Sequence, residues 1–140
     1  MHKDDALMAE NGSSLKRKTR TFSARIFSLL RILFKRRITF DKFRPDIYLT
    51  DGQKLDEYGL NATVIHIPGH TKGSIGLLTG DGNLFAGDTF TNNKKPDIAN
   101  YIENPVELKN SIDRLKKMNI HKVYPGHGKP FLMEQISLKL

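Results

Sequence analysis

The sequence contains no cysteine among its 140 residues. This absence excludes a disulfide scaffold, and it also excludes any metal site built from thiolate ligands. If the chain binds a metal ion, its protein ligands must therefore be imidazole nitrogens and carboxylate oxygens.

Long apolar runs are also absent, because none approaches the roughly 18 residues that a membrane-spanning helix requires. Met1 is not followed by the charged and apolar segments of a secretory signal. There is no internal repeat and no low-complexity tract. From these absences we expect a soluble, cytoplasmic protein.

The overall composition is typical of one globular domain. Hydrophobic residues make up 38% of the sequence and charged residues 27%, a balance that suits a folded chain better than a disordered one. A length of 140 residues gives room for one ordinary core but not for two. We therefore expect a single domain.

Positive charge is concentrated in residues 16–44. This segment holds eleven of the 23 Lys and Arg residues and one acid, Asp41, so it carries +10 while the rest of the chain sums to −2. Apolar residues recur at intervals of three and four from Phe22 to Phe34, which predicts a basic amphipathic helix.

Three roles fit such a helix: covering its own domain, contacting nucleic acid, or lying on a membrane surface through residues 22–37. No recognised nucleic-acid module accompanies the charge, so we expect no nucleic-acid partner. The structural role is favoured, and the membrane surface is the next alternative.

Beyond this segment the chain alternates short β-type runs with one helix. Strands are predicted at residues 46–49, 62–67, 74–79, 83–86 and 122–124. The third and fourth of these form a hairpin around Gly80, Asp81 and Gly82. Asn104 as N-cap and Pro105 at the first helical position predict a helix that runs to about residue 118. A short helix near residues 4–8 is predicted to stop at residues 11–12.

Three polar residues each follow a predicted strand, namely His70, Asp88 and His127, and glycine stands beside each one. Glycine lets the backbone turn tightly, and the ends of neighbouring strands can converge on one edge of a sheet. Imidazole and carboxylate groups bind zinc, iron or manganese. On spacing alone, hydrogen bonding of each histidine to a turn remains the commoner explanation.

The motifs that contain these residues occur in a familiar order. The stretch VIHIPGHTKGSIGLLTGDGNLFAGDTF at residues 64–90, followed by KVYPGHGKPF at 122–131, resembles the metallo-β-lactamase superfamily and is most similar to the glyoxalase II-like hydrolases. The resemblance covers residues 46–131. It implies an α/β fold of the αββα sandwich type, with two metal ions at one edge of the sheets.

The resemblance also implies roles for the three residues. His70 matches a ligand of the first metal, Asp88 the carboxylate that bridges both metals, and His127 a ligand of the second. Zinc is the expected ion, with iron and manganese as alternatives. The implied activity is hydrolysis of an ester, thioester or related bond in a small-molecule substrate by hydroxide generated at the metal centre. Placing all three residues on one ion, as in mononuclear iron enzymes, is the disfavoured alternative.

One motif of the family is missing from the chain. The run His-x-His-x-Asp-His, which supplies four metal ligands, occurs nowhere, and MHKDDA resembles the segment that follows it. We therefore interpret residues 1–140 as a single, incomplete, N-terminally truncated domain and a partial sandwich, with residues 16–44 as a basic helical insertion.

This interpretation carries expectations about activity. A catalytic zinc usually has three protein ligands, and neither ion would reach that number here. We expect doubtful metal occupancy and an inactive hydrolase domain; the alternatives are a degenerate non-catalytic module or a basic peripheral membrane protein. Exposed apolar surface and unpaired strand edges also predict poor solubility or association with a complementary chain.

The remaining candidate residues receive less specific roles. His66 is predicted to support the site or the core without binding metal. His2 and His121 are expected at the surface. Lys94 and Lys95 are expected to be solvated loop residues, and contact with an anionic substrate is the less favoured alternative.

Overall fold

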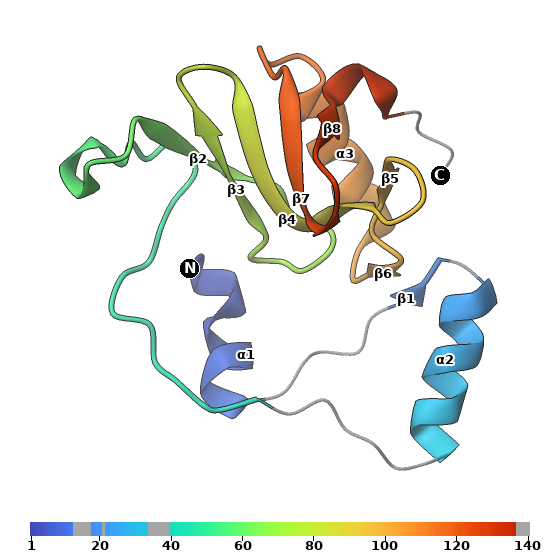
Figure 1. Cartoon of the computed structure of the whole chain (residues 1–140). Coiled ribbons are helices and arrows are strands. Elements are labelled where there is room, and N and C mark those ends of the chain that lie inside the picture. Colours follow the sequence, from blue (N-terminus) through green and yellow to red (C-terminus); the bar gives the residue numbers. More distant parts are fainter. Residues whose placement is uncertain (13–17, 21, 34–39, 137–140) are drawn as a thin grey trace.

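The computed structural model describes residues 1–12, 18–20, 22–33 and 40–136 (Figure 1). Residue 34, the predicted end of the basic helix, and residues 34–37 of the predicted membrane contact lie outside these ranges. In chain order the elements are η1 (Lys3–Asp5), α1 (Ala6–Asn11), β1 (Lys18–Thr19), α2 (Phe22–Leu33), η2 (Asp56–Tyr58), β2 (Ala62–His66), β3 (Ile75–Thr79), β4 (Asn83–Asn92), β5 (Asp97–Ile98), β6 (Tyr101–Ile102), α3 (Pro105–Leu115), β7 (Lys122–Gly128), β8 (Phe131–Leu132) and η3 (Met133–Gln135).

A six-stranded sheet forms the centre of the fold. The strands lie in the order β2-β3-β4-β7-β8, and β5 also pairs with β4. Only β4 and β7 run parallel, whereas the other pairs of this sheet are antiparallel. Parallel neighbours need a crossover connection, and α3 supplies it on one face of the sheet (Figure 1).

The core lies between α3 and the sheet. Asn104 caps α3, because its side-chain oxygen accepts hydrogen bonds from the backbone N–H groups of Val106 (3.0 Å) and Glu107 (3.3 Å). The helix then buries one apolar face against the strands. Fully buried members of this core include Leu84, Phe90, Leu108, Ile112, Leu115 and Val123. Each such side chain contributes about 1.5–3 kcal/mol through burial.

The opposite face of the sheet is less well covered. Side chains alternate between the two faces of a strand, so Phe85 points away from the core that Leu84 and Ala86 enter. Phe85 stacks on Tyr124 of β7, with ring centroids 4.7 Å apart, and it is 47% exposed. Apolar surface at Phe85 is therefore open on this face.

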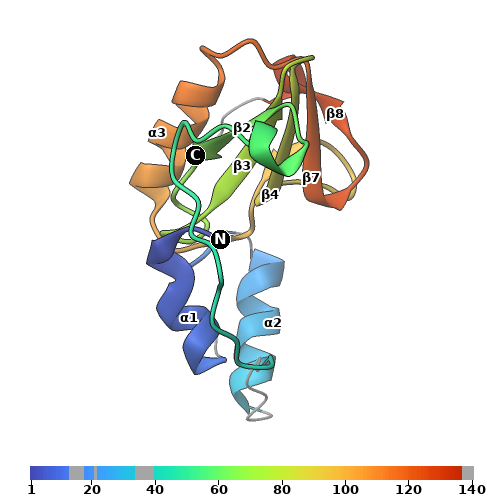
Figure 2. The same cartoon turned by 90° about the vertical axis from the view of Figure 1, so that its left-hand side faces the viewer.

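Two helices project from one end of the sheet (Figure 1, Figure 2). The first, α1, ends at Gly12, which adopts the left-handed conformation with φ 61°. The second, α2, is joined to the sheet region through β1, which pairs with β6. Both helices were predicted, with similar bounds.

Three strand predictions need correction. Residues 46–49 form no strand; their backbone instead bonds the N-terminal residue, with Leu49 N–H donating to the Met1 carbonyl at 2.8 Å. Strands β4 and β7 extend well beyond residues 86 and 124, because their parallel pairing continues through two register shifts. Asp88 and His127 therefore lie within strands, not in the loops after them.

Candidate metal centre

His70 lies in the turn between β2 and β3, and this turn rests on the start of α3. The Gly69 carbonyl accepts hydrogen bonds from the N–H groups of Glu103 (2.8 Å) and Asn104 (3.0 Å). Gly69 has φ 135°, and a Cβ there would overlap the backbone of Leu108. Only glycine fits this close approach, so the position of His70 depends on it.

One ring nitrogen of His70 is held by backbone. Nδ1 lies 2.7 Å from the Tyr101 carbonyl oxygen of β6. A carbonyl only accepts hydrogen bonds, so Nδ1 carries a proton, and in the neutral ring the lone pair is then on Nε2. A histidine whose second nitrogen is fixed in this way is the usual form of a metal ligand.

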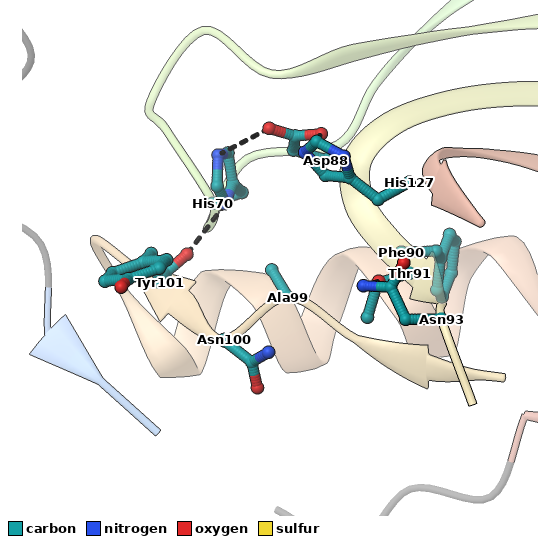
Figure 3. Close-up of a pocket in the computed structure, with 9 residues that line it drawn as sticks. All are labelled: His70, Asp88, Phe90, Thr91, Asn93, Ala99, Asn100, Tyr101 and His127. Atoms are coloured by element: carbon teal, nitrogen blue, oxygen red, sulfur yellow. Dashed lines mark hydrogen bonds and ion pairs between the residues drawn. The ribbon is translucent and has the colours of Figure 1, made fainter. Parts of the chain in front are cut away.

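Asp88 and His127 come from the neighbouring parallel strands β4 and β7. The Nε2 atom of His127 lies 3.4 Å from Asp88 Oδ1, and the Nε2 atom of His70 lies 3.9 Å from Asp88 Oδ2 (Figure 3). The two imidazoles thus approach different oxygens of one carboxylate. Space for that carboxylate exists because residue 126 is glycine, and a Cβ there would overlap Asp88 Oδ1.

Two pockets border this group. One, of about 270 Å³, is lined by all three candidate ligands together with Phe90, Thr91, Asn93, Ala99, Asn100 and Tyr101 (Figure 3). The other, of about 420 Å³, lies against His70 and Asp88 and is also lined by Thr89. The Thr89 hydroxyl is buried and has no hydrogen-bond partner among the described residues. Lys94 and Lys95 are exposed and line neither pocket.

A buried carboxylate that the sequence did not single out supports the His70 turn. Asp5 Oδ2 accepts a 2.7 Å hydrogen bond from the Thr71 hydroxyl, and Asp5 Oδ1 accepts a 2.9 Å bond from the Gly73 N–H. Asp5 belongs to η1, more than 60 residues earlier in the chain. Distant pairing of this kind leaves no signal in local sequence spacing, which explains the omission.

Comparison with known proteins bears on this geometry. The sequence model of the metallo-beta-lactamase superfamily matches residues 2–127. The chain belongs to this superfamily. The predicted α/β fold of this superfamily is confirmed by solved structures, of which the chain matches about half.

Superfamily members with known structures share the fold at low sequence identity. A metallo-beta-lactamase family protein from Thermus thermophilus aligns with a TM-score of 0.64 and 21% identity, over 96% of this chain and 48% of that one. BLEG-1 B3 metallo-beta-lactamase aligns with a TM-score of 0.65 and 22% identity, over 96% and 59%. A third protein with this fold, solved in a di-iron-bound form, aligns with a TM-score of 0.61 and 19% identity, over 96% of this chain and 59% of that one. The chain thus corresponds to about half of a typical superfamily structure.

Curated superfamily relatives match in sequence over shorter stretches. The chain is 32% identical over 100 residues to the acyl-coenzyme A thioesterase MBLAC2 of Homo sapiens, which covers 66% of this chain and 35% of that protein. It is 50% identical over 42 residues to a hydroxyacylglutathione hydrolase of Aeromonas hydrophila, covering 30% and 16%. The chain spans about a third of the first relative and less of the second. These matches confirm the expected distant homology to glyoxalase II-like hydrolases.

The superfamily is typically metal-dependent, and the donors here suit that chemistry. Two imidazoles that face separate oxygens of one carboxylate match a bridging carboxylate between two cations. Among the described residues, the donor atoms of His2, Asp4 and His66 all lie within 4.8 Å of one another. The donor atoms of His70, Asp88 and His127 do not form such a group. A single ion held by His70, Asp88 and His127 is therefore disfavoured, and their role as ligands stays a prediction.

The second histidine cluster requires a correction, because His2 was expected at the surface and is only 7% exposed. Its ring stacks on His66, with centroids 4.1 Å apart and planes 15° apart. The two histidines and Asp4 are close enough for a metal ion. Nearly parallel rings cannot both aim an in-plane lone pair at one ion, however, so binding would require them to leave the stack.

The stack has its own electrostatic and hydrogen-bonding character. Burial, and then the neighbouring His66 ring, lower the pKa of His2 below its ordinary value. His66 Nε2 lies 2.8 Å from the Lys72 carbonyl, so it donates there and ties β2 to the turn that carries His70. His66 thus supports this turn, while its predicted lack of a metal-binding role stays a prediction. His121 is exposed, as expected.

Proposed function

We propose that this domain carries part of the metal centre of a hydrolase, with His70 and His127 as ligands of two cations and Asp88 as the bridge between them. The observation that carries the proposal is the approach of the two Nε2 atoms to separate oxygens of Asp88, at 3.9 and 3.4 Å. Zinc is the ion we expect, and iron and manganese suit the same donors.

When bound, such ions act as Lewis acids and acidify a water molecule, so that hydroxide forms near neutral pH. The residues of the chain prepare the place for this chemistry. Tyr101, through its carbonyl, holds the His70 ring so that its Nε2 atom faces Asp88. The wall of the 270 Å³ pocket combines the apolar Phe90 with the amide groups of Asn93 and Asn100. This mixture suits a small molecule that has a polar group to orient and an apolar part to bury.

We infer that the substrate bond is an ester, a thioester or a related acyl bond. One relative is named as an acyl-coenzyme A thioesterase, and another as a hydroxyacylglutathione hydrolase. A thioester is therefore the bond class to test first. The substrate remains a proposal, because the chain covers only part of each relative.

The number of donors limits what these three residues do alone. Shared between two ions, they give each ion two protein ligands, and a catalytic zinc usually has three. We infer weak metal binding and no hydrolysis by these three donors unaided. Further donors, such as histidines of a complementary chain, have a place to enter at the 420 Å³ pocket beside His70 and Asp88.

The direct test is metal content and zinc affinity of the purified chain, measured by elemental analysis and titration calorimetry. Asp88→Ala should abolish binding, because it removes the group that both ions share. Asp46→Ala, which removes an exposed carboxylate that lines neither pocket, should leave affinity unchanged. His127→Ala should weaken binding, whereas His121→Ala should not.

Zinc binding that persists in Asp88→Ala would contradict the proposal. Binding that depends on Asp88 would support it. Tight, stoichiometric binding would overturn the narrower inference that the three donors alone bind weakly. In that case an acyl-coenzyme A thioester is the first substrate to assay. Turnover of this thioester by the chain alone would overturn the inference that the three donors do not support hydrolysis unaided.

A further inference from the structure

Helix α2 exposes its apolar residues to solvent. Phe22 is 77% exposed, Leu29 59%, Leu30 48% and Ile26 44%. At 100° per residue these four side chains fall within an arc of about 100°, so they form one stripe along the helix. A stripe of this size on a surface normally has a partner. We call these four residues the α2 stripe.

The helix stands away from the sheet, so the sheet does not cover the stripe. Figure 1 and Figure 2 both show α2 projecting beyond the end of the sheet, beside neither face. None of the four side chains belongs to the hydrophobic core formed with α3. The stripe is therefore available to a partner outside the described part of the chain.

The base of α2 is nevertheless firmly attached. Arg20, two residues before the helix, donates a 2.6 Å hydrogen bond to Asp97 Oδ2, and its backbone N–H bonds the Asn100 carbonyl at 2.8 Å. Strand β1 pairs with β6, which carries Tyr101 of the pocket wall. A surface that engages the stripe would thus hold the rim of the candidate metal centre close to itself.

Charge indicates which partner fits. The helix contains no acidic residue, and exposed Arg25 lies next to the stripe on the helical wheel. In the sequence, residues 16–44 carry a net charge of +10. Two copies of this segment would repel each other across a shared stripe, whereas an anionic surface would attract it. Nucleic acid would satisfy the charge but would leave the apolar side chains unburied.

We propose that α2 docks on an anionic phospholipid bilayer, with the α2 stripe in the acyl-chain boundary and the basic residues at the headgroups. A helix of this kind lies in the plane of the interface and needs no membrane span. Within the described residues, no helix has the length and apolar character to cross a bilayer. Each basic residue near an anionic leaflet strengthens binding by about fivefold.

The test is co-sedimentation of the full chain with vesicles of phosphatidylcholine alone and of phosphatidylcholine with 30% phosphatidylserine. We expect binding to the anionic vesicles only, and a marked loss when salt is raised from about 50 to 300 mM, because screening weakens the attraction. The double substitution Ile26→Asp with Leu30→Asp should reduce partitioning by about tenfold or more, because it removes half of the stripe.

Two further variants serve as controls. One distinguishes loss of apolar contact from added negative charge, and the other introduces an acid at an exposed leucine outside the α2 stripe. Ile26→Ser with Leu30→Ser adds no negative charge and should still lose most of the binding. Leu60→Asp introduces one acid at an exposed leucine between η2 and β2 and should change binding by about twofold or less. Circular dichroism should show the same helix content in every variant, because the altered side chains are exposed.

Equal binding to neutral and anionic vesicles, or no binding to either, would overturn the proposal. So would loss of a dimer in the serine variant, measured by analytical ultracentrifugation, since a second copy would then cover the stripe. Binding of an RNA oligonucleotide that displaces the chain from vesicles and is unaffected by the serine substitutions would assign the charge to nucleic acid instead.

Discussion

The sheet with α3 and the projecting helix α2 use the same kinds of apolar residue in opposite ways. In the sheet region Phe90, Leu108 and Ile112 are completely buried. In α2, Phe22 and Leu29 are mostly exposed. Both regions are locally regular, so secondary structure alone does not decide burial. The difference is that α3 is the crossover between two paired strands, whereas among the described residues α2 is joined to the sheet region through the short β1–β6 pairing and the hydrogen bonds of Arg20.

The largest expected effect follows from removing a core aromatic side chain. Phe90→Ala should lower the free energy of unfolding by about 3–5 kcal/mol, because it leaves a cavity under α3. Leu30→Ala in α2 is the matched comparison and should change it by less than about 0.5 kcal/mol. Urea unfolding monitored by circular dichroism measures both. Similar losses in the two variants would abolish the distinction between the regions.

Asp5 offers the next largest effect, because it links the N-terminal segment to the His70 turn. Asp5→Ala should cost about 2–3 kcal/mol, since the buried Thr71 hydroxyl and the Gly73 N–H lose their acceptor. Asp5→Asn should cost about half as much, because an amide can bond both groups. Zinc affinity should follow the same order. If the alanine and asparagine variants lost the same free energy of unfolding, the two hydrogen bonds of Asp5 would not be what stabilises the His70 turn.

A substitution at Gly126 tests the candidate metal centre without changing the hydrophobic core. A Cβ at this position would overlap Asp88 Oδ1, and the backbone of residue 126 does not require glycine for its φ value. Gly126→Ala should therefore lower zinc affinity by about tenfold, equivalent to about 1.4 kcal/mol, with little change in unfolding. Titration calorimetry checks the first expectation and urea unfolding the second. Unchanged zinc affinity would mean that Asp88 does not bind the ion in this position.

The smallest effect concerns the attachment of α3 to the segment before β2. Arg114 donates to Asp51 Oδ2 at 2.9 Å, and the His66 N–H donates to Asp51 Oδ1 at 2.8 Å. Burial opposes ionisation, but these hydrogen bonds outweigh it and hold the pKa of Asp51 below its ordinary value of 3.8. The carboxylate is therefore favoured in the folded state. Because the ion pair is substantially exposed, Asp51→Asn should cost at most about 1 kcal/mol at neutral pH.

This contribution has a defined pH dependence. A carboxyl whose pKa is lower in the folded state stabilises the protein above its unfolded pKa, and the stabilisation is lost as pH falls through the folded pKa. The difference between wild type and Asp51→Asn should thus be constant above about pH 5 and should shrink below pH 3.8. Urea unfolding over this range measures it, and a difference that grows on acidification would contradict the assignment.

Sequence reasoning succeeded where the signal is local. The helix cap at Asn104, the stop at Gly12 and the hairpin around residues 80–82 all depend on neighbouring residues, and each was predicted. The motifs around His70, Asp88 and His127 identified the family because their residue types and order are specific. These residues do meet in space, although their ligand roles remain to be measured.

The misses share a physical cause, which is dependence on distant parts of the chain. The lengths of β4 and β7 are set by their mutual pairing, which alternating polarity does not reveal. Residues 46–49 have β-type composition but bond Met1 instead of a strand. The burial of His2 follows from its stack on His66, 64 residues away. No periodic pattern near residue 2 or residue 46 records these contacts.

The parallel pairing of β4 and β7 also bears on how this centre tolerates change during evolution. Asp88 and His127 are 39 positions apart in sequence, yet one backbone ladder sets their separation. Insertions or deletions in the connection between β4 and β5, residues 93–96, can therefore accumulate without altering the distance between the two side chains. The loops that border the pocket can change in sequence and length, while the spacing between Asp88 and His127 stays the same.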